Sequence, residues 1–167
     1  MKKILVLKTF SLTDDGIQEE FGVNHVGHFL FTKLLLPKIK ASQPARIVNV
    51  SSRGHLLVEG GIEFEKLSDP NAHDAMQRLV DTHMLRRKDL SFSETFFLSS
   101  SISTEDEAIT TLYCATSPEI EEKNYRGRYF DPFGIEVEKS SCAKDDDLAK
   151  KFWEFTENLI NVILSQE

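Results

Sequence analysis

The side chains best placed for chemistry lie in two short stretches. The first, residues 21–29, reads Phe-Gly-Val-Asn-His-Val-Gly-His-Phe and carries Asn24 within a helical pattern. The second, residues 46–54, is an apolar strand pattern that ends in Ser51 and Ser52. Ligands of open α/β sheets bind at the carboxyl ends of parallel strands, so these serines stand where chemistry is expected. A purely structural interpretation is also open, in which Asn24 bridges a helical turn and the serines satisfy backbone groups.

The elements that must position these residues can be predicted from the apolar pattern. Apolar residues recur at helical spacing from residue 17 to about residue 40, which predicts a long, mostly buried helix. Residues 4–7 and 45–50 predict strands on either side of it. Strand, helix and strand then form a right-handed crossover of a parallel sheet. The predicted fold class is therefore α/β, in a single domain over residues 1–167.

The C-terminal half predicts two further helices and a hairpin. A hydroxyl and acidic pattern at residues 104–107 indicates a helix to about residue 116, before Pro118. Residues 125–138 predict an irregular hairpin, and Asp145 to Asp147 predict the start of an amphipathic helix. Residues 72–87 have weak helical character, and the serine-rich residues 91–103 predict a loop. We therefore expect an irregular, insert-like segment over residues 79–103.

Composition and charge exclude several classes of protein. Twenty Lys and Arg against 27 Asp and Glu give a net charge of −7 without a basic cluster, so nucleic acid is not an expected partner. Cys114 and Cys142 are too few for a disulfide framework and predict reduced thiols in the cytosol. The first apolar run is too short for a signal peptide, and no run is long enough for a membrane span. A soluble, cytoplasmic protein is expected.

The same two stretches, in this order, resemble the short-chain dehydrogenase/reductase family, and in particular its retinol-dehydrogenase-like branch. The resemblance covers residues 10 to about 78 and resumes from about 104 to 160. It implies a partial Rossmann-like, three-layer fold with a truncated parallel sheet. It also implies a role for NAD(P) and a small carbonyl or alcohol as substrate. By this resemblance Asn24 holds a water linked to the catalytic lysine, Ser52 hydrogen-bonds the substrate carbonyl, and Lys33 contacts the cofactor.

Two parts of that family's site are missing from the sequence. A phenol with a pKa near 10 is a poor proton donor at neutral pH unless a cation lowers it, and the family supplies that cation with Tyr-x-x-x-Lys. No tyrosine here has a lysine four residues later, and Tyr113, in a similar-looking stretch, is followed at that distance by Ser117. None of the eight glycines opens a dinucleotide-binding loop. The chain resembles a truncated or mis-spliced product.

Three hypotheses follow. The first is an incomplete oxidoreductase with Asn24 and Ser52 as its residual site and no appreciable turnover by the isolated chain. The second is a non-catalytic interaction module, a homo- or hetero-oligomer formed through an exposed sheet edge or the long helix. The third is a marginally stable polypeptide without a selected role. His25 and His28 share a helix face, but no third ligand has a fitting spacing, so a metal site is not expected.

Overall fold

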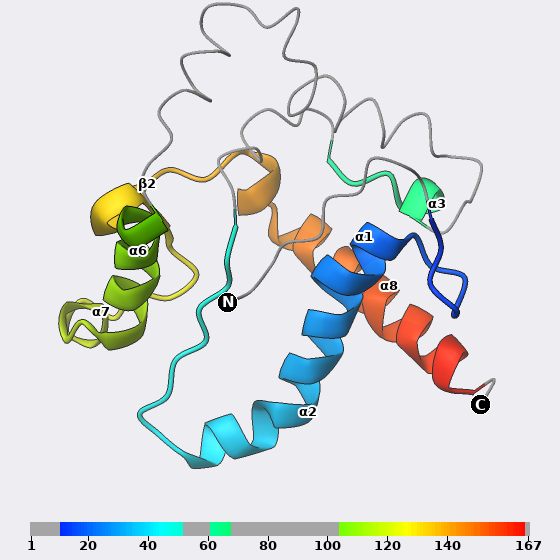
Figure 1. The fold of residues 1–167 in the computed structure, drawn as a ribbon, viewed down its shortest axis with the longest axis horizontal. Helices are drawn as coiled ribbons and strands as arrows, with labels where there is room; N and C mark the ends of the chain where they lie inside the picture. The colour runs from blue at the N-terminus through cyan, green and yellow to red at the C-terminus, as the bar shows by residue number, and fades with distance from the viewer. Residues whose placement is uncertain (1–10, 52–60, 68–103, 166–167) are drawn as a thin grey trace, which may run out of the picture.

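One continuous helical run forms the N-terminal part of the structure (Figure 1). The computed structural model describes residues 11–51, 61–67 and 104–165. The run comprises α1 (Glu19–Phe21), the π-helical segment η1 (Gly22–Val26) and α2 (Gly27–Ala41). The side chain of Gln18 caps its start by accepting a hydrogen bond from the Phe21 amide at 2.6 Å. The helix predicted over residues 17–40 is confirmed.

The core lies where this run meets the C-terminal helix α8 (Asp146–Leu164) and the short helix α3 (Phe64–Leu67). Figure 1 shows α8 passing beside α1 and the start of α2. The buried apolar side chains come from all three regions and are Ile17, Phe21, Val26, Phe64, Leu67 and Ile160. Asp145 caps α8 by accepting from the Leu148 amide at 2.9 Å, as the acidic run predicted.

A second packing unit is formed by α6 (Thr104–Thr116), α7 (Glu119–Glu122) and a hairpin. The hairpin pairs β1 (Tyr129–Asp131) antiparallel with β2 (Ile135–Val137) around the 3-10 turn η4 (Pro132–Gly134). A further 3-10 turn, η5 (Cys142–Lys144), leads into α8. The helix predicted over residues 104–116 and the hairpin predicted within residues 125–138 are both confirmed.

Gly134 allows this hairpin to pack closely against α6. Its φ is 73°, in the left-handed region that favours glycine. A Cβ atom at this position would lie 2.9 Å from the Cγ and Cδ1 atoms of the Tyr113 ring. Thr110 of α6 accepts a hydrogen bond from the Gly134 amide at 3.2 Å and donates to the Asp131 carbonyl at 3.1 Å. The turn is therefore held on α6 by close contact and by hydrogen bonds.

The strand predicted over residues 45–50 is wrong. This segment is irregular, and its apolar side chains Ile47 and Val50 are 46% and 54% exposed. β-Branched residues favour a strand only where a neighbouring strand pairs with them, and the described residues provide no such neighbour. Within those residues the only sheet is the hairpin, so the described part is mixed α and β without the parallel, three-layer arrangement. The predictions for residues 4–7, 72–87 and 79–103 lie outside the described residues.

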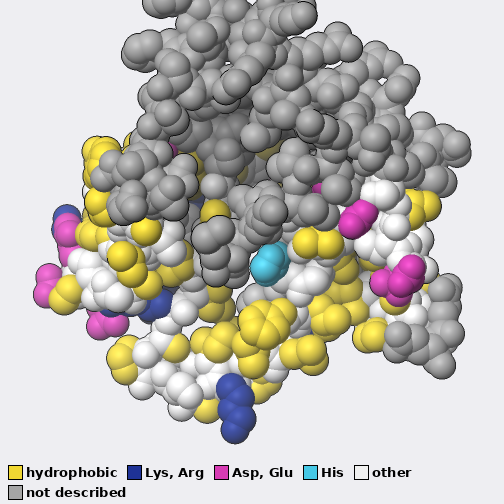
Figure 2. Space-filling view, viewed as in Figure 1, with side chains coloured by type: hydrophobic (Ala, Val, Ile, Leu, Met, Phe, Trp, Pro, Cys, Tyr) yellow, Lys and Arg dark blue, Asp and Glu magenta, His cyan; other side chains and the backbone are white. Residues whose placement is uncertain are grey.

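The expectation that the long helix is mostly buried is also wrong. No residue of α2 is buried, and Phe31 and Leu34 are 63% and 69% exposed. Figure 2, seen from the same side as Figure 1, shows apolar side chains at the surface over α2. The run packs against α8 mainly through its N-terminal part, where Phe21 and Val26 are buried.

Candidate functional site

Asn24 lies in the middle of the π-helical segment. The Gly27 amide bonds the Gly22 carbonyl, five residues earlier, in place of the α-helical spacing of four. π-Helical turns are rare and often occur at functional sites, because the extra residue changes which side chains face a given direction. The Asn24 side chain is partly buried there. This geometry marks the first predicted site residue as a structurally unusual position.

His25, the next residue, joins this segment to α8. Its ring stacks on Phe21 at 5.1 Å and on Phe152 at 4.3 Å between ring centroids. Its Nε2 atom lies 2.9 Å from the hydroxyl oxygen of the fully buried Thr156. Burial lowers the pKa of the imidazole below its usual 6.5. His25 therefore makes a partly buried polar contact to a residue far away in the sequence.

The hydrogen bonds around Thr156 fix the proton on His25. The Thr156 hydroxyl donates to the Phe152 carbonyl at 2.8 Å, one turn earlier in α8. A hydroxyl has a single proton, so its oxygen must accept from the imidazole. Nε2 of His25 is consequently the protonated ring nitrogen. Because 131 residues separate the pair, periodicity along the chain gave no signal for it.

Lys33 is engaged with α8. Its Nζ atom lies 2.7 Å from Oε1 of Glu157, and both side chains are partly exposed. The hydrogen bond from Lys33 holds the pKa of the Glu157 carboxyl below its usual value. Along the helix axis, nine residues separate Lys33 from Asn24, a rise of roughly 13 Å. The structure therefore places Lys33 in an ion pair, well away from Asn24.

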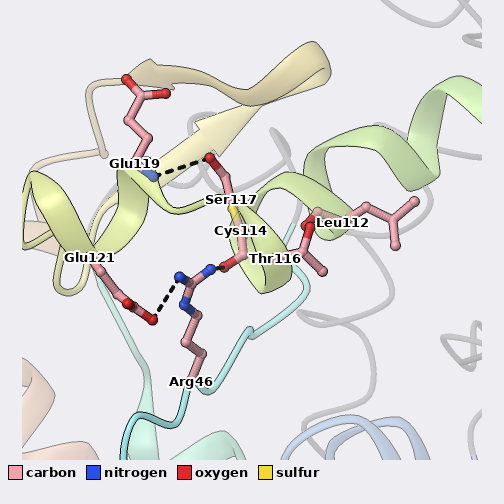
Figure 3. A network of polar contacts seen from close by, with 7 residues as sticks. All are labelled: Arg46, Leu112, Cys114, Thr116, Ser117, Glu119 and Glu121. Atoms are coloured by element: carbon pink, nitrogen blue, oxygen red, sulfur yellow. Dashed lines mark hydrogen bonds and ion pairs between the residues drawn. The ribbon is translucent and has the colours of Figure 1, made fainter.

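Ser52 lies outside the described residues, so the structure does not show whether Ser52 meets Asn24. Ser51, the last described residue before it, is exposed. The segment that leads to these serines is anchored by Arg46, whose side chain is only 18% exposed. Figure 3 shows Arg46 reaching from this segment to the end of α6 and to α7.

Arg46 satisfies groups that the two helices leave open. Its Nη1 atom donates to the Cys114 carbonyl at 3.4 Å, in the last turn of α6, where backbone carbonyls have no partner within the helix. Its Nη2 atom pairs with Oε1 of Glu121 at 2.9 Å. α6 has no basic residue in its own last turn, so Arg46 supplies the cation that this helix end favours. Our reading of the sequence gave Arg46 no role.

Tyr113 does not have the environment of a proton donor. Its hydroxyl donates to Oε2 of Glu119 at 2.9 Å, and its ring packs edge-on against Phe130. Partial burial and the Glu119 carboxylate raise the pKa of this phenol. Acid–base chemistry near neutral pH needs the opposite shift. Tyr113 is a packing residue of the α6–hairpin unit.

The described residues do not fit a dinucleotide cofactor. A pyrophosphate needs glycines that let backbone amides approach it at a helix start, and the described glycines form no such loop. An open groove of about 470 Å³ lies on the hairpin, but its cations already have partners. Arg128 pairs with Glu136, Lys144 with Glu138, and Lys139 donates to the Gly127 carbonyl. None of the residues lining the groove belongs to the helical run that carries Asn24.

Neither a metal-binding cluster nor a membrane-spanning helix occurs within the described ranges. No cluster of three or more His, Cys, Asp and Glu side chains there is arranged to hold a metal ion. No helix in those ranges has both the length and the apolar character to cross a bilayer. Cys114 and Cys142 are free thiols, and burial raises the pKa of the Cys114 thiol. A thiol with that shift is a weak nucleophile at neutral pH.

Comparison with known proteins identifies relatives that match up to about nine tenths of this chain. Short-chain dehydrogenase TIC 32 B, chloroplastic, of Brassica napus is 31% identical over 91% of this chain and 60% of its own length. Retinol dehydrogenase 13 of Mus musculus is 30% identical over 92% of this chain and 56% of its own length. Retinol dehydrogenase 13 of Homo sapiens is 57% identical over 56 residues, or 34% of this chain and 16% of its own length.

These alignments cover only part of each relative. The chain spans less than two thirds of the length of these relatives, and the Brassica alignment runs over 196 residues, more than the 167 of this chain, so it contains gaps in this chain. No family model matches the sequence, and no solved structure does. The similarity nevertheless extends over about nine tenths of the chain. Over that share its curated relatives are short-chain dehydrogenases and retinol dehydrogenases, so the resemblance to the short-chain dehydrogenase/reductase family, in its retinol-dehydrogenase-like branch, is confirmed.

Proposed function

We propose that this chain carries part of an oxidoreductase site that acted ancestrally on a small carbonyl or alcohol with NAD(P). Asn24 and Ser52 are its remaining catalytic positions, and Lys33 is the residue that would contact the cofactor. The observation that supports this most strongly is the π-helical turn around Asn24, which is held to α8 by His25. The names of the relatives, which include retinol dehydrogenases, support the same reaction class and an alcohol as substrate. The proposal also includes a fold derived from the Rossmann-like parallel sheet of the family.

The isolated chain has no appreciable turnover in this proposal. The reaction needs a proton donor beside the carbonyl that receives hydride. The sequence has no Tyr-x-x-x-Lys, and Tyr113 is held by Glu119 in an environment that raises its pKa. Lys33 would have to leave Glu157 to contact a cofactor phosphate. Asn24 and Ser52 would still supply hydrogen bonds, but the chain lacks the residue that would donate the proton.

Two measurements on the purified chain test this proposal. Oxidation of NADH and NADPH with a panel of aldehydes should not exceed the rate without protein. Calorimetric titration with either nucleotide should show no saturable heat. Turnover that Ser52→Ala abolishes and Ser51→Ala preserves would overturn the inactivity while supporting the role of Ser52. Saturable binding that Lys33→Met weakens would overturn the absence of a cofactor site.

A second candidate function is association with a full-length relative or a second copy through α2. The exposed side chains of Phe31 and Leu34 favour it, since large apolar groups at a surface gain free energy when a partner covers them. This function needs no proton donor and no cofactor. It belongs to a different class from catalysis.

Light scattering after size-exclusion chromatography tests this second candidate. The chain should elute as a dimer, or as a complex with an added full-length relative, and Phe31→Ser with Leu34→Ser should weaken either assembly. Ile135→Ser is a matched control, because Ile135 is 59% exposed on the hairpin instead of on α2. A monomer at high concentration that does not bind the relative would exclude this function.

A further inference from the structure

We propose that His25 and Thr156 are positioning residues for Asn24, so that the C-terminal helix sets the geometry of the π-helical turn. This inference rests on the proposed role of Asn24. Its first support is adjacency: His25 follows Asn24 within the same five-residue π segment. The orientation of the His25 side chain therefore constrains the backbone that carries Asn24.

The second support is the way His25 is held. The imidazole packs nearly parallel to Phe21 of its own run at 5.1 Å and to Phe152 of α8 at 4.3 Å between ring centroids. The two phenyl rings are themselves 6.3 Å apart, so they contact the imidazole from adjacent sides. Its Nε2–H donates to the Thr156 hydroxyl at 2.9 Å. Stacking limits the tilt of the ring, while the hydrogen bond fixes its rotation within that plane. Together these contacts restrict the orientation of the imidazole.

The third support is the burial of Thr156. Its exposed fraction is 0%, and its one proton is used by the Phe152 carbonyl, so its oxygen is oriented as an acceptor toward His25. A buried donor that loses its acceptor is costly because no water replaces the bond. α2 makes a further contact to α8 at the Lys33–Glu157 pair, which is partly exposed and therefore weaker. Among the described contacts, the partly buried His25–Thr156 pair is the polar link between the Asn24 turn and α8.

The test compares Thr156→Val with Thr156→Ser in the full chain. Valine keeps the shape and removes the hydroxyl, while serine keeps the hydroxyl. The Gly27 amide closes the π turn, so its hydrogen exchange reports on that turn. We expect Thr156→Val to speed this exchange roughly 5- to 150-fold, the factor for a buried donor left without a partner, and Thr156→Ser to stay near the wild type.

Thr116→Val is the matched control. Thr116 makes the same bond to a carbonyl four residues earlier, Leu112 at 2.8 Å, but it is exposed and bonds no histidine. The control should leave the Gly27 amide unchanged. If Thr156→Val proves unstable, His25→Phe keeps the stacking and removes the hydrogen bond, and it should speed the exchange in the same way.

Nitrogen NMR of the imidazole supplies a readout that packing alone would not change. Nε2 of His25 should carry the proton in the wild type and in Thr156→Ser, and Thr156→Val should disturb both this signature and the side-chain amide signal of Asn24. Proton on Nδ1 in the wild type, or an undisturbed Asn24 signal in Thr156→Val, would overturn the inference. No nucleotide or substrate is present in these measurements, so their outcome is independent of whether the chain binds NAD(P).

Discussion

Replacing Arg46 with methionine tests whether this arginine fixes the segment before the strand-end serines. Methionine keeps most of the apolar stem and removes the guanidinium. Two interactions are lost: the ion pair with the largely exposed Glu121 and the hydrogen bond to the Cys114 carbonyl at the end of α6. The change therefore separates the polar contribution of Arg46 from its packing.

The expected loss of stability follows from the geometry. Glu121 is 55% exposed, so the pair contributes roughly 0.2–1 kcal/mol. The bond to Cys114 is long at 3.4 Å, and a cation at a helix C-terminus adds about 0.3–1 kcal/mol. Arg46→Met should thus lower the free energy of unfolding by about 1 kcal/mol. In a double-mutant cycle with Glu121→Gln, the coupling should account for about half of it.

Urea unfolding of Arg46→Met, Glu121→Gln and the double variant measures these quantities. Arg126→Met is the control, because the exposed Arg126 bonds only to its neighbour Asn124 in the described contacts, at 2.8 Å, and its removal should change stability by less than about 0.5 kcal/mol. A loss for Arg46→Met no larger than that of this control would refute the anchoring role. A loss above about 4 kcal/mol would instead indicate that the guanidinium belongs to a buried polar network whose partners are left unpaired.

Three further outcomes are expected. Folding lowers the pKa of His25, so this imidazole binds a proton more readily in the unfolded chain than in the folded one. The free energy of unfolding should therefore fall as the pH drops below about 6.5. Urea titrations from pH 7.5 to 5 should show this fall in the wild type and a smaller fall in His25→Phe. Gly134→Ala should lower the free energy of unfolding by about 2–4 kcal/mol, because the new Cβ meets the Tyr113 ring and the φ is left-handed. Gly127→Ala, which has open space around it, should lower the free energy of unfolding by about 1 kcal/mol. Equal losses of stability in thermal unfolding would contradict the close contact at Gly134. Ile160→Ala, at a core position only 4% exposed, should cost about 2–5 kcal/mol, and a loss below 1 kcal/mol would place this side chain outside the core.

Local signals predicted the elements that have clear capping or turn residues. The acidic cap at Asp145 and the apolar repeat after it predicted α8, and the turn residues at Pro132 and Gly134 predicted the hairpin. The signal for each lies in residues close together in the sequence, so propensity and periodicity were sufficient to predict it.

The errors occur where structure depends on distant partners. Residues 45–50 have strand propensity, but the described chain offers them no strand to pair with, and Arg46 holds them to α6 and α7 instead. The apolar repeat of α2 predicted that the whole helix is buried. The packing against α8 does not reach Phe31 and Leu34, which are exposed. The resemblance predicts Asn24 as a site residue. The π turn around it and the contact between His25 and Thr156 depend on three-dimensional packing, which no local pattern reports.

The π-helical segment has a consequence for the surface of this molecule. One extra residue in a helical turn rotates everything after it by about 100° about the axis, relative to an uninterrupted α-helix. Side chains before and after residues 22–26 therefore point in directions that a regular helix would not combine, with Phe21 directed inward and Phe31 outward. Removing a single residue from that stretch would restore regular α-helical geometry and rotate the exposed apolar residues of α2 about the helix axis by the same angle. The insertion that shapes the surroundings of Asn24 thus also decides which apolar residues α2 presents to solvent.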